Sequence, residues 1–93
     1  MSGQREQRRV VYTGHVQGVG FRYTTRNLAS GFDVRGYVKN LPDGSVELVC
    51  QGVPPELNAY LSEVRSHFVG QIRDEKTSTS PVDIDYRGFE IQH

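Results

Sequence analysis

The sequence predicts an α+β fold in which two helices cover one face of a mixed, mainly antiparallel β-sheet. Apolar residues recur at strand spacing in some segments and at helix spacing in others. Turns containing glycine or proline separate these segments. The 93 residues suffice for one domain with one modest core. Because no repeat or low-complexity tract interrupts the chain, we expect residues 8–93 to form that domain and the polar residues 1–7 to form a flexible tail.

The predicted elements follow the order β-α-β-β-α-β, with a short strand added at the C-terminal end. They are a strand at 8–16, a helix at 21–30, strands at 32–40 and 45–51, a helix at 54–69, and strands at 72–78 and 89–91. The second helix has the clearest pattern, a single apolar stripe made by Leu57, Tyr60, Leu61, Val64 and Phe68. This order of elements is that of the ferredoxin-like sandwich.

The ferredoxin-like topology brings two distant segments together. In such a sheet the first two strands run parallel and the third strand lies between them. The turn after the first strand and the end of the second strand are therefore at the same edge, about two strand spacings or ~10 Å apart. We expect the turn at 17–20 and Asn40 to share one site.

Charge and cysteine content exclude several classes of protein. Lys+Arg and Asp+Glu both number 11, whereas proteins that neutralise nucleic-acid phosphates normally carry a basic excess. The single cysteine, Cys50, forms no internal disulfide. His15, His67 and His93 fall in unrelated elements, so we expect no metal site. The chain has neither an apolar run of transmembrane length nor a signal peptide, so we expect a cytoplasmic location.

The segment Gly14–Arg22 carries the clearest chemical signal. A glycine-rich turn between a strand and a helix allows successive amides to point at one spot, and the helix start adds unpaired N–H groups. Together they form a cradle for an anion such as phosphate. Arg22, in the first helical turn, can hold two phosphate oxygens at once. The segment matches neither the dinucleotide fingerprint nor the Walker pattern of phosphate-binding loops. The alternative interpretation is a turn that connects strand and helix without binding an anion.

Asn40 ends the predicted second strand. Asparagine at such a position commonly begins a turn. Here the topology places it beside the cradle, where its amide can orient a water molecule without being ionised.

Two separated blocks of the chain resemble the acylphosphatase family. The run Gly14–Arg22 is similar to the family signature, glycine-x-valine-glutamine-glycine-valine-x-phenylalanine-arginine. The run Val34–Val46 is similar to the second block, in which an asparagine precedes an Asp-Gly hairpin. The order of elements agrees as well, so the resemblance covers about residues 8–92.

The resemblance implies a hydrolase that converts acyl phosphates to a carboxylate and inorganic phosphate by in-line attack of water, with no metal or cofactor. The family's phosphate-binding arginine falls on Arg22, its water-orienting asparagine on Asn40, and a supporting hydroxyl residue on Ser45. We expect a monomer whose partners are small molecules, with no nucleic acid or membrane bound. The family's cradle of backbone amides falls on Gln17, Gly18, Val19, Gly20, Phe21 and Arg22.

Three other interpretations fit the sequence less well. Carbamoyl-phosphate-processing domains share the glycine-arginine block but usually continue with proline, whereas Tyr23 follows Arg22 here, so we expect a free-standing enzyme. A phosphate- or anion-binding module without catalysis would have no need of both Arg22 and Asn40. An RNA-binding sheet would show aromatic and basic residues on its central strands, but the predicted strand at 45–51 has neither.

Overall fold

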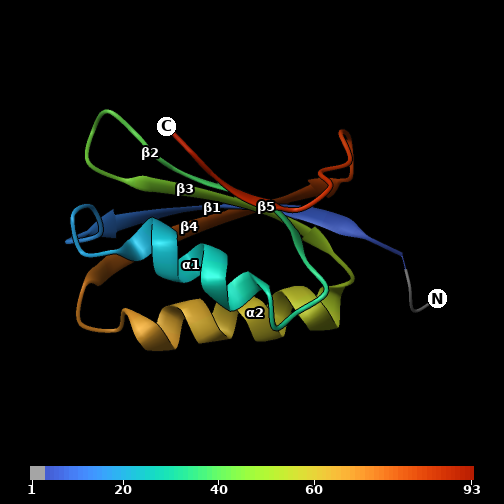
Figure 1. Cartoon of the computed structure of the whole chain (residues 1–93), viewed down its shortest axis with the longest axis horizontal. Coiled ribbons are helices and arrows are strands. Elements are labelled where there is room, and N and C mark those ends of the chain that lie inside the picture. Colours follow the sequence, from blue (N-terminus) through green and yellow to red (C-terminus); the bar gives the residue numbers. More distant parts are fainter. Residues whose placement is uncertain (1–3) are drawn as a thin grey trace.

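The computed structural model of the chain describes residues 4–93 as a single sheet with two helices. Its elements are β1 (Glu6–Gly14), α1 (Phe21–Ala29), β2 (Arg35–Asn40), β3 (Val46–Gly52), α2 (Pro54–His67), β4 (Ile72–Pro81) and β5 (Phe89–Gln92). Both helices lie on the same side of the sheet (Figure 1). The predicted order and the two-layer arrangement are therefore confirmed.

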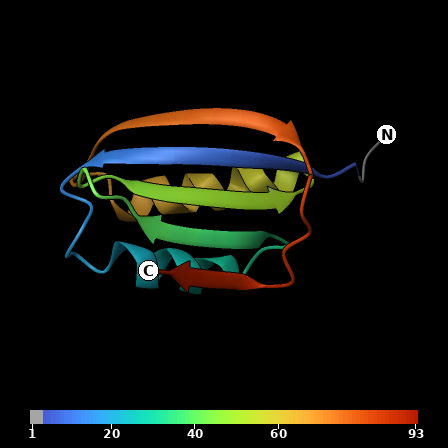
Figure 2. The same ribbon diagram turned by 90° about the horizontal axis from the view of Figure 1, so that it is seen from above.

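The strand order is β4-β1-β3-β2-β5 (Figure 2). β3 pairs antiparallel with both β1 and β2, so the first two strands run parallel with the third between them, as expected. β4 adds an antiparallel edge to β1, and β5 adds a parallel edge to β2. The C-terminal ends of β1 and β2 consequently lie at the same end of the sheet.

Several element boundaries differ from the sequence-based prediction. β1 begins at Glu6, so residues 6 and 7, expected in the flexible tail, pair with β3 and β4. Residues 1–3 of that tail lie outside the described part of the chain. β2 begins at Arg35 rather than at 32, because the amides of Gly31 and Phe32 still donate to the carbonyls that end α1.

β4 is longer than predicted and runs on to Pro81. Its residues are nearly all exposed, because β4 is an edge strand whose polar side chains face water on both sides. Strand periodicity reports the burial of one face. An exposed edge strand has no such pattern, so its end could not be found from sequence.

The core lies between the sheet and the helices. The predicted stripe of α2 is buried in full, and it meets the inward-facing residues of β1, β2 and β3. Tyr60 of this stripe also donates a hydrogen bond to the main-chain oxygen of Thr25, at 2.8 Å, which joins the two helices. Cys50 is buried among these residues as a free thiol, and burial raises its pKa to about 12.

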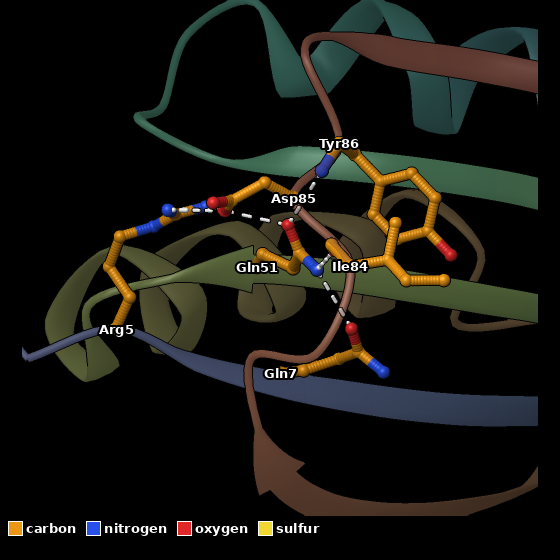
Figure 3. Close-up of polar contacts among 6 residues, drawn as sticks. All are labelled: Arg5, Gln7, Gln51, Ile84, Asp85 and Tyr86. Atoms are coloured by element: carbon orange, nitrogen blue, oxygen red, sulfur yellow. Dashed lines mark hydrogen bonds and ion pairs between the residues drawn. The ribbon is translucent and has the colours of Figure 1, made fainter.

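The connection between β4 and β5 is held by the buried side chain of Gln51 (Figure 3). Its Oε1 accepts hydrogen bonds from the backbone N–H of Tyr86 at 3.1 Å and from Arg5 at 3.4 Å. Its Nε2 donates to Gln7 Oε1 and to the main-chain oxygen of Ile84. Four contacts satisfy this buried amide fully. They tie the segment that leads into β5 to the central strands.

Candidate active site

The turn between β1 and α1 has a backbone that favours glycine at two positions. Gly18 has φ of 80° and Gly20 has φ of 78°, both in the left-handed region. Side chains other than glycine adopt this conformation at a cost. A Cβ atom at either position would meet nothing within 4 Å, so backbone conformation rather than crowding accounts for these glycines. The space above both residues is open.

Gly20 is also the N-cap of α1, and the start of this helix leaves several amides without partners. The first helical hydrogen bond runs from the N–H of Thr24 to the oxygen of Gly20, at 3.0 Å. Within residues 4–93, no side chain caps the helix, and its first turn holds no acidic residue. The N–H groups of Phe21, Arg22 and Tyr23 therefore precede the helical hydrogen bonds and can bind an anion.

Arg22 is half-buried and lies against the end of β5. Its Nη1 donates to the main-chain oxygen of Gln92 and to Nδ1 of His93, both at 3.3 Å. These contacts are long for hydrogen bonds that involve a guanidinium. They place the guanidinium beside the N-terminus of α1, and its other donors have no hydrogen-bond partner within residues 4–93.

Asn40 is the last residue of β2 and faces the same region. Its Oδ1 is buried and has no hydrogen-bond partner among the described residues. An unsatisfied buried acceptor costs about 1–3 kcal/mol. Such an atom is therefore a natural acceptor for a bound water or a ligand.

These groups line one cleft of about 340 Å³. Five residues predicted for the site come together here, namely Gly18, Gly20, Phe21, Arg22 and Asn40. Four further residues, which were not predicted for the site, complete the lining, namely Val16, Tyr23, Ile91 and His93. Gln17, Val19 and Ser45, which were also predicted, do not line the cleft.

Gln17 connects the turn to the β2–β3 hairpin. Its Nε2 donates to the main-chain oxygens of Leu41 and Ser45, at 2.9 Å each. Gln17 was expected to contribute its backbone amide; its side chain, in addition, spans the gap between the two halves of the site.

Ser45 supports the hairpin rather than the cleft. Its hydroxyl and its N–H both donate to Oδ1 of Asp43. These hydrogen bonds stabilise the ionised carboxylate and hold the pKa of Asp43 below its usual value. His15, also considered beside the cradle, is exposed and lies outside the cleft lining.

Comparison with known proteins identifies the family. The acylphosphatase family model matches residues 8–91. The chain belongs to the acylphosphatase family. An acylphosphatase from Vibrio cholerae is 37% identical over 89 residues, covering 95% of this chain and 98% of its own. An acylphosphatase from Archaeoglobus fulgidus is 38% identical over 85 residues, covering 90% and 94%.

Solved structures agree with this family assignment. The crystal structure of an acylphosphatase from Bacillus subtilis superimposes with a TM-score of 0.85 and 29% identity, over 95% of this chain and 99% of that chain. Full-length HypF superimposes with a TM-score of 0.87 at 24% identity, but the match covers 12% of HypF. At 24% identity, the similarity to HypF shows a shared fold and nothing about function.

The four acylphosphatase cleft residues that sequence analysis left out come from several parts of the fold. Tyr23 directly follows Arg22, and this adjacency in sequence could have identified it as a site residue. Ile91 and His93 reach the cleft because β5 pairs parallel to β2 and ends beside Asn40. The sequence of a short terminal strand does not indicate which side of the sheet it will pair with.

Within residues 4–93 no group of three or more His, Cys, Asp or Glu residues is arranged to hold a metal ion. The same part of the acylphosphatase chain has no helix that is both long and apolar enough to cross a membrane.

Proposed function

We propose that this acylphosphatase-family protein hydrolyses acyl phosphates to a carboxylate and inorganic phosphate. The observation that carries the proposal is the convergence, in one cleft, of the N-terminal amides of α1, the guanidinium of Arg22 and Oδ1 of Asn40, which has no hydrogen-bond partner among residues 4–93. The Vibrio cholerae, Archaeoglobus fulgidus and Bacillus subtilis relatives, matched along nearly their whole length, are named acylphosphatases, which favours this activity over a carbamoyl-phosphate-processing role.

In the proposed complex, the phosphoryl group lies over the turn at 17–22. The amides at the start of α1 and the positive end of its dipole face the phosphoryl oxygens. The other donors of Arg22 bind two of these oxygens, while its Nη1 keeps its contacts with Gln92 and His93. Charge spreads over the phosphoryl oxygens in a loose transition state, so preorganised donors stabilise it more than they stabilise the substrate.

Asn40 orients the attacking water in this mechanism. Its Oδ1 accepts a hydrogen bond from the water and directs the water's lone pair at phosphorus, in line with the leaving carboxylate. The bond from water oxygen to phosphorus forms as the bond from phosphorus to the carboxyl oxygen breaks. A phosphoryl oxygen of the substrate takes the water proton. Because a carboxylate is a good leaving group, no general acid is required.

The positive charge for this chemistry comes from the protein itself. Arg22 and the helix amides supply what a metal ion supplies in other phosphoryl-transfer sites, so we infer activity without metal or cofactor. We further infer a monomer that acts on small molecules and resides in the cytoplasm, where its free thiol at Cys50 is in keeping with a reducing compartment.

Hydrolysis of benzoyl phosphate with EDTA present tests the proposal. The wild type, Arg22→Ala and Asn40→Ala are compared, with Arg35→Ala as control because Arg35 is an exposed arginine of β2 outside the cleft. We expect rapid turnover by the wild type and by the control. Arg22→Ala should lose roughly 10²–10³-fold in kcat, and Asn40→Ala should lower kcat far more than it raises KM.

Circular dichroism of each variant separates loss of chemistry from loss of fold. A well-folded wild type that is inert toward benzoyl, acetyl and carbamoyl phosphate would contradict the proposed activity and favour an anion-binding module. Full kcat in folded Asn40→Ala would contradict the role of Asn40.

A further inference from the structure

The cleft has more room than a phosphoryl group requires. Its volume of about 340 Å³ falls within the range of about 300–1,000 Å³ seen for pockets that hold whole small molecules. The lining residues that suit a phosphoryl group and its attacking water are Gly18, Gly20, Arg22 and Asn40. Of the other lining residues, Val16 and Phe21 belong to the buried core. Tyr23, Ile91 and His93 are left to face the group attached to the phosphoryl oxygen.

Tyr23 is the large exposed side chain of this wall. Its residue is 61% exposed, although it lies next to Arg22 in the first turn of α1. The guanidinium of Arg26 lies over the ring, 5.3 Å from its centroid, and this cation–π contact restrains the ring without covering it. Within residues 4–93 the large exposed hydrophobic residues are Tyr23, Val69 and Ile84, and of these Tyr23 lines the cleft.

Ile91 supplies a second apolar surface in the same cleft. It is half-buried on β5, where it pairs with Val38. Among the described residues that line the cleft, none is an Asp or Glu that would repel or bind a charged acyl group, and His93 lies exposed at the end of β5. Apolar walls beside a few polar groups are typical of sites that orient an apolar ligand by its polar end.

We propose that Tyr23 and Ile91 form an acyl subsite that favours substrates with a planar, apolar acyl group, that is, aromatic carboxyl phosphates. This inference rests on the proposed acyl phosphate hydrolysis and concerns the part of the substrate that the phosphate cradle does not contact. A benzoyl ring has a face to pack on the tyrosine ring, whereas acetyl phosphate offers one methyl group. The side chain of Tyr23 thus determines specificity without touching the phosphoryl group.

The test is the ratio of kcat/KM for benzoyl phosphate to kcat/KM for acetyl phosphate. Tyr23→Ala should lower this ratio roughly five- to tenfold, the effect of losing one aromatic pair. Tyr23→Phe should keep the wild-type ratio, because the ring rather than the hydroxyl makes the contact. Val69→Ala, at a position 78% exposed and outside the cleft, is the control for removing an exposed apolar side chain.

Inhibition by inorganic phosphate separates the acyl subsite from the phosphate cradle. Inorganic phosphate has no acyl group, so its inhibition constant should be the same in Tyr23→Ala as in the wild type. An unchanged substrate ratio in Tyr23→Ala would overturn the subsite. Equal losses on both substrates with weaker phosphate inhibition would also overturn it, since Tyr23 would then act through Arg22. A wild type inert toward both substrates would instead overturn the proposed hydrolysis.

Discussion

The side chain of Gln17 is hydrogen-bonded to the main-chain oxygen of Ser45, at 2.9 Å. The bond joins the glycine-rich turn, which carries the candidate phosphate cradle, to the hairpin that follows Asn40. A second bond from the same nitrogen to Leu41 fixes the glutamine from two directions. The relative position of the two halves of the site therefore depends on a residue that lies outside the cleft.

We expect Gln17→Glu to impair both stability and activity. The substitution preserves the shape of the side chain, but replaces a donor by a carboxylate oxygen facing two carbonyl oxygens. Two lost hydrogen bonds should lower the free energy of unfolding by about 1–3 kcal/mol, and the drift of the turn from Asn40 should reduce kcat more than KM. Urea unfolding and steady-state kinetics measure the two effects.

Gln4→Glu makes the same chemical change at an exposed position and should alter neither quantity. Wild-type kcat in Gln17→Glu would show that the cradle and Asn40 keep their relative position without this link.

Arg22→Lys should fail to restore the activity lost in Arg22→Ala. Lysine keeps the charge but lacks the planar fork, and it cannot bond to Gln92 and a phosphoryl group in the same way. We expect kcat/KM to fall roughly 10²-fold or more, measured with benzoyl phosphate. The matched control is Arg35→Lys on the exposed part of β2, for which kcat/KM should equal that of the wild type. Recovery of most activity in Arg22→Lys would reduce the role of Arg22 to that of a point charge.

Tyr37 should make stability depend on pH in the alkaline range. Its hydroxyl donates to Glu47 at 3.0 Å, and burial together with this carboxylate raises its pKa to about 12. The neutral phenol is favoured in the folded state. Its contribution is therefore complete below about pH 10, the usual pKa of tyrosine, and is lost as the pH rises toward about 12.

The measurement is the difference in free energy of unfolding between wild type and Tyr37→Phe as a function of pH. This difference should be about 1 kcal/mol near neutral pH and should shrink above about pH 10. Tyr86→Phe is the control, since its ring packs on Tyr37 at 5.6 Å but it has no hydrogen bond to Glu47. A difference that stays constant with pH would contradict the assignment.

Thr25→Val should stabilise the protein. Thr25 is fully buried on α1, with 0% exposure, and its hydroxyl oxygen has no hydrogen-bond partner among the described residues. Valine has the same shape and removes the unsatisfied group, so the free energy of unfolding should rise by about 1 kcal/mol. Thermal or urea unfolding provides the measurement. Thr79→Val on the exposed face of β4 should show no such gain, and a loss of stability in Thr25→Val would indicate that a buried water bonds to the hydroxyl.

The sequence alone predicted the parts of the fold that depend on local chemistry. Apolar residues recur at a fixed spacing along a helix or strand that buries one face, so every residue of the α2 stripe was predicted. Glycine spacing marked the turn before α1, because left-handed φ values at Gly18 and Gly20 have few alternatives to glycine. Arg22 and Asn40 could be placed at one edge because the order of elements dictates which strand ends coincide.

The tertiary structure decided the features that depend on contacts between distant segments. Sequence patterns contain no information on which edge a short strand joins, so the arrival of Ile91 and His93 at the cleft was not predictable. The exposed strand β4 lacks a buried face and therefore lacks a pattern. The side-chain hydrogen bonds of Gln17 and Gln51 also join distant segments. The sequence does not show which glutamine amides point to solvent and which join two segments, because that depends on the folded surroundings.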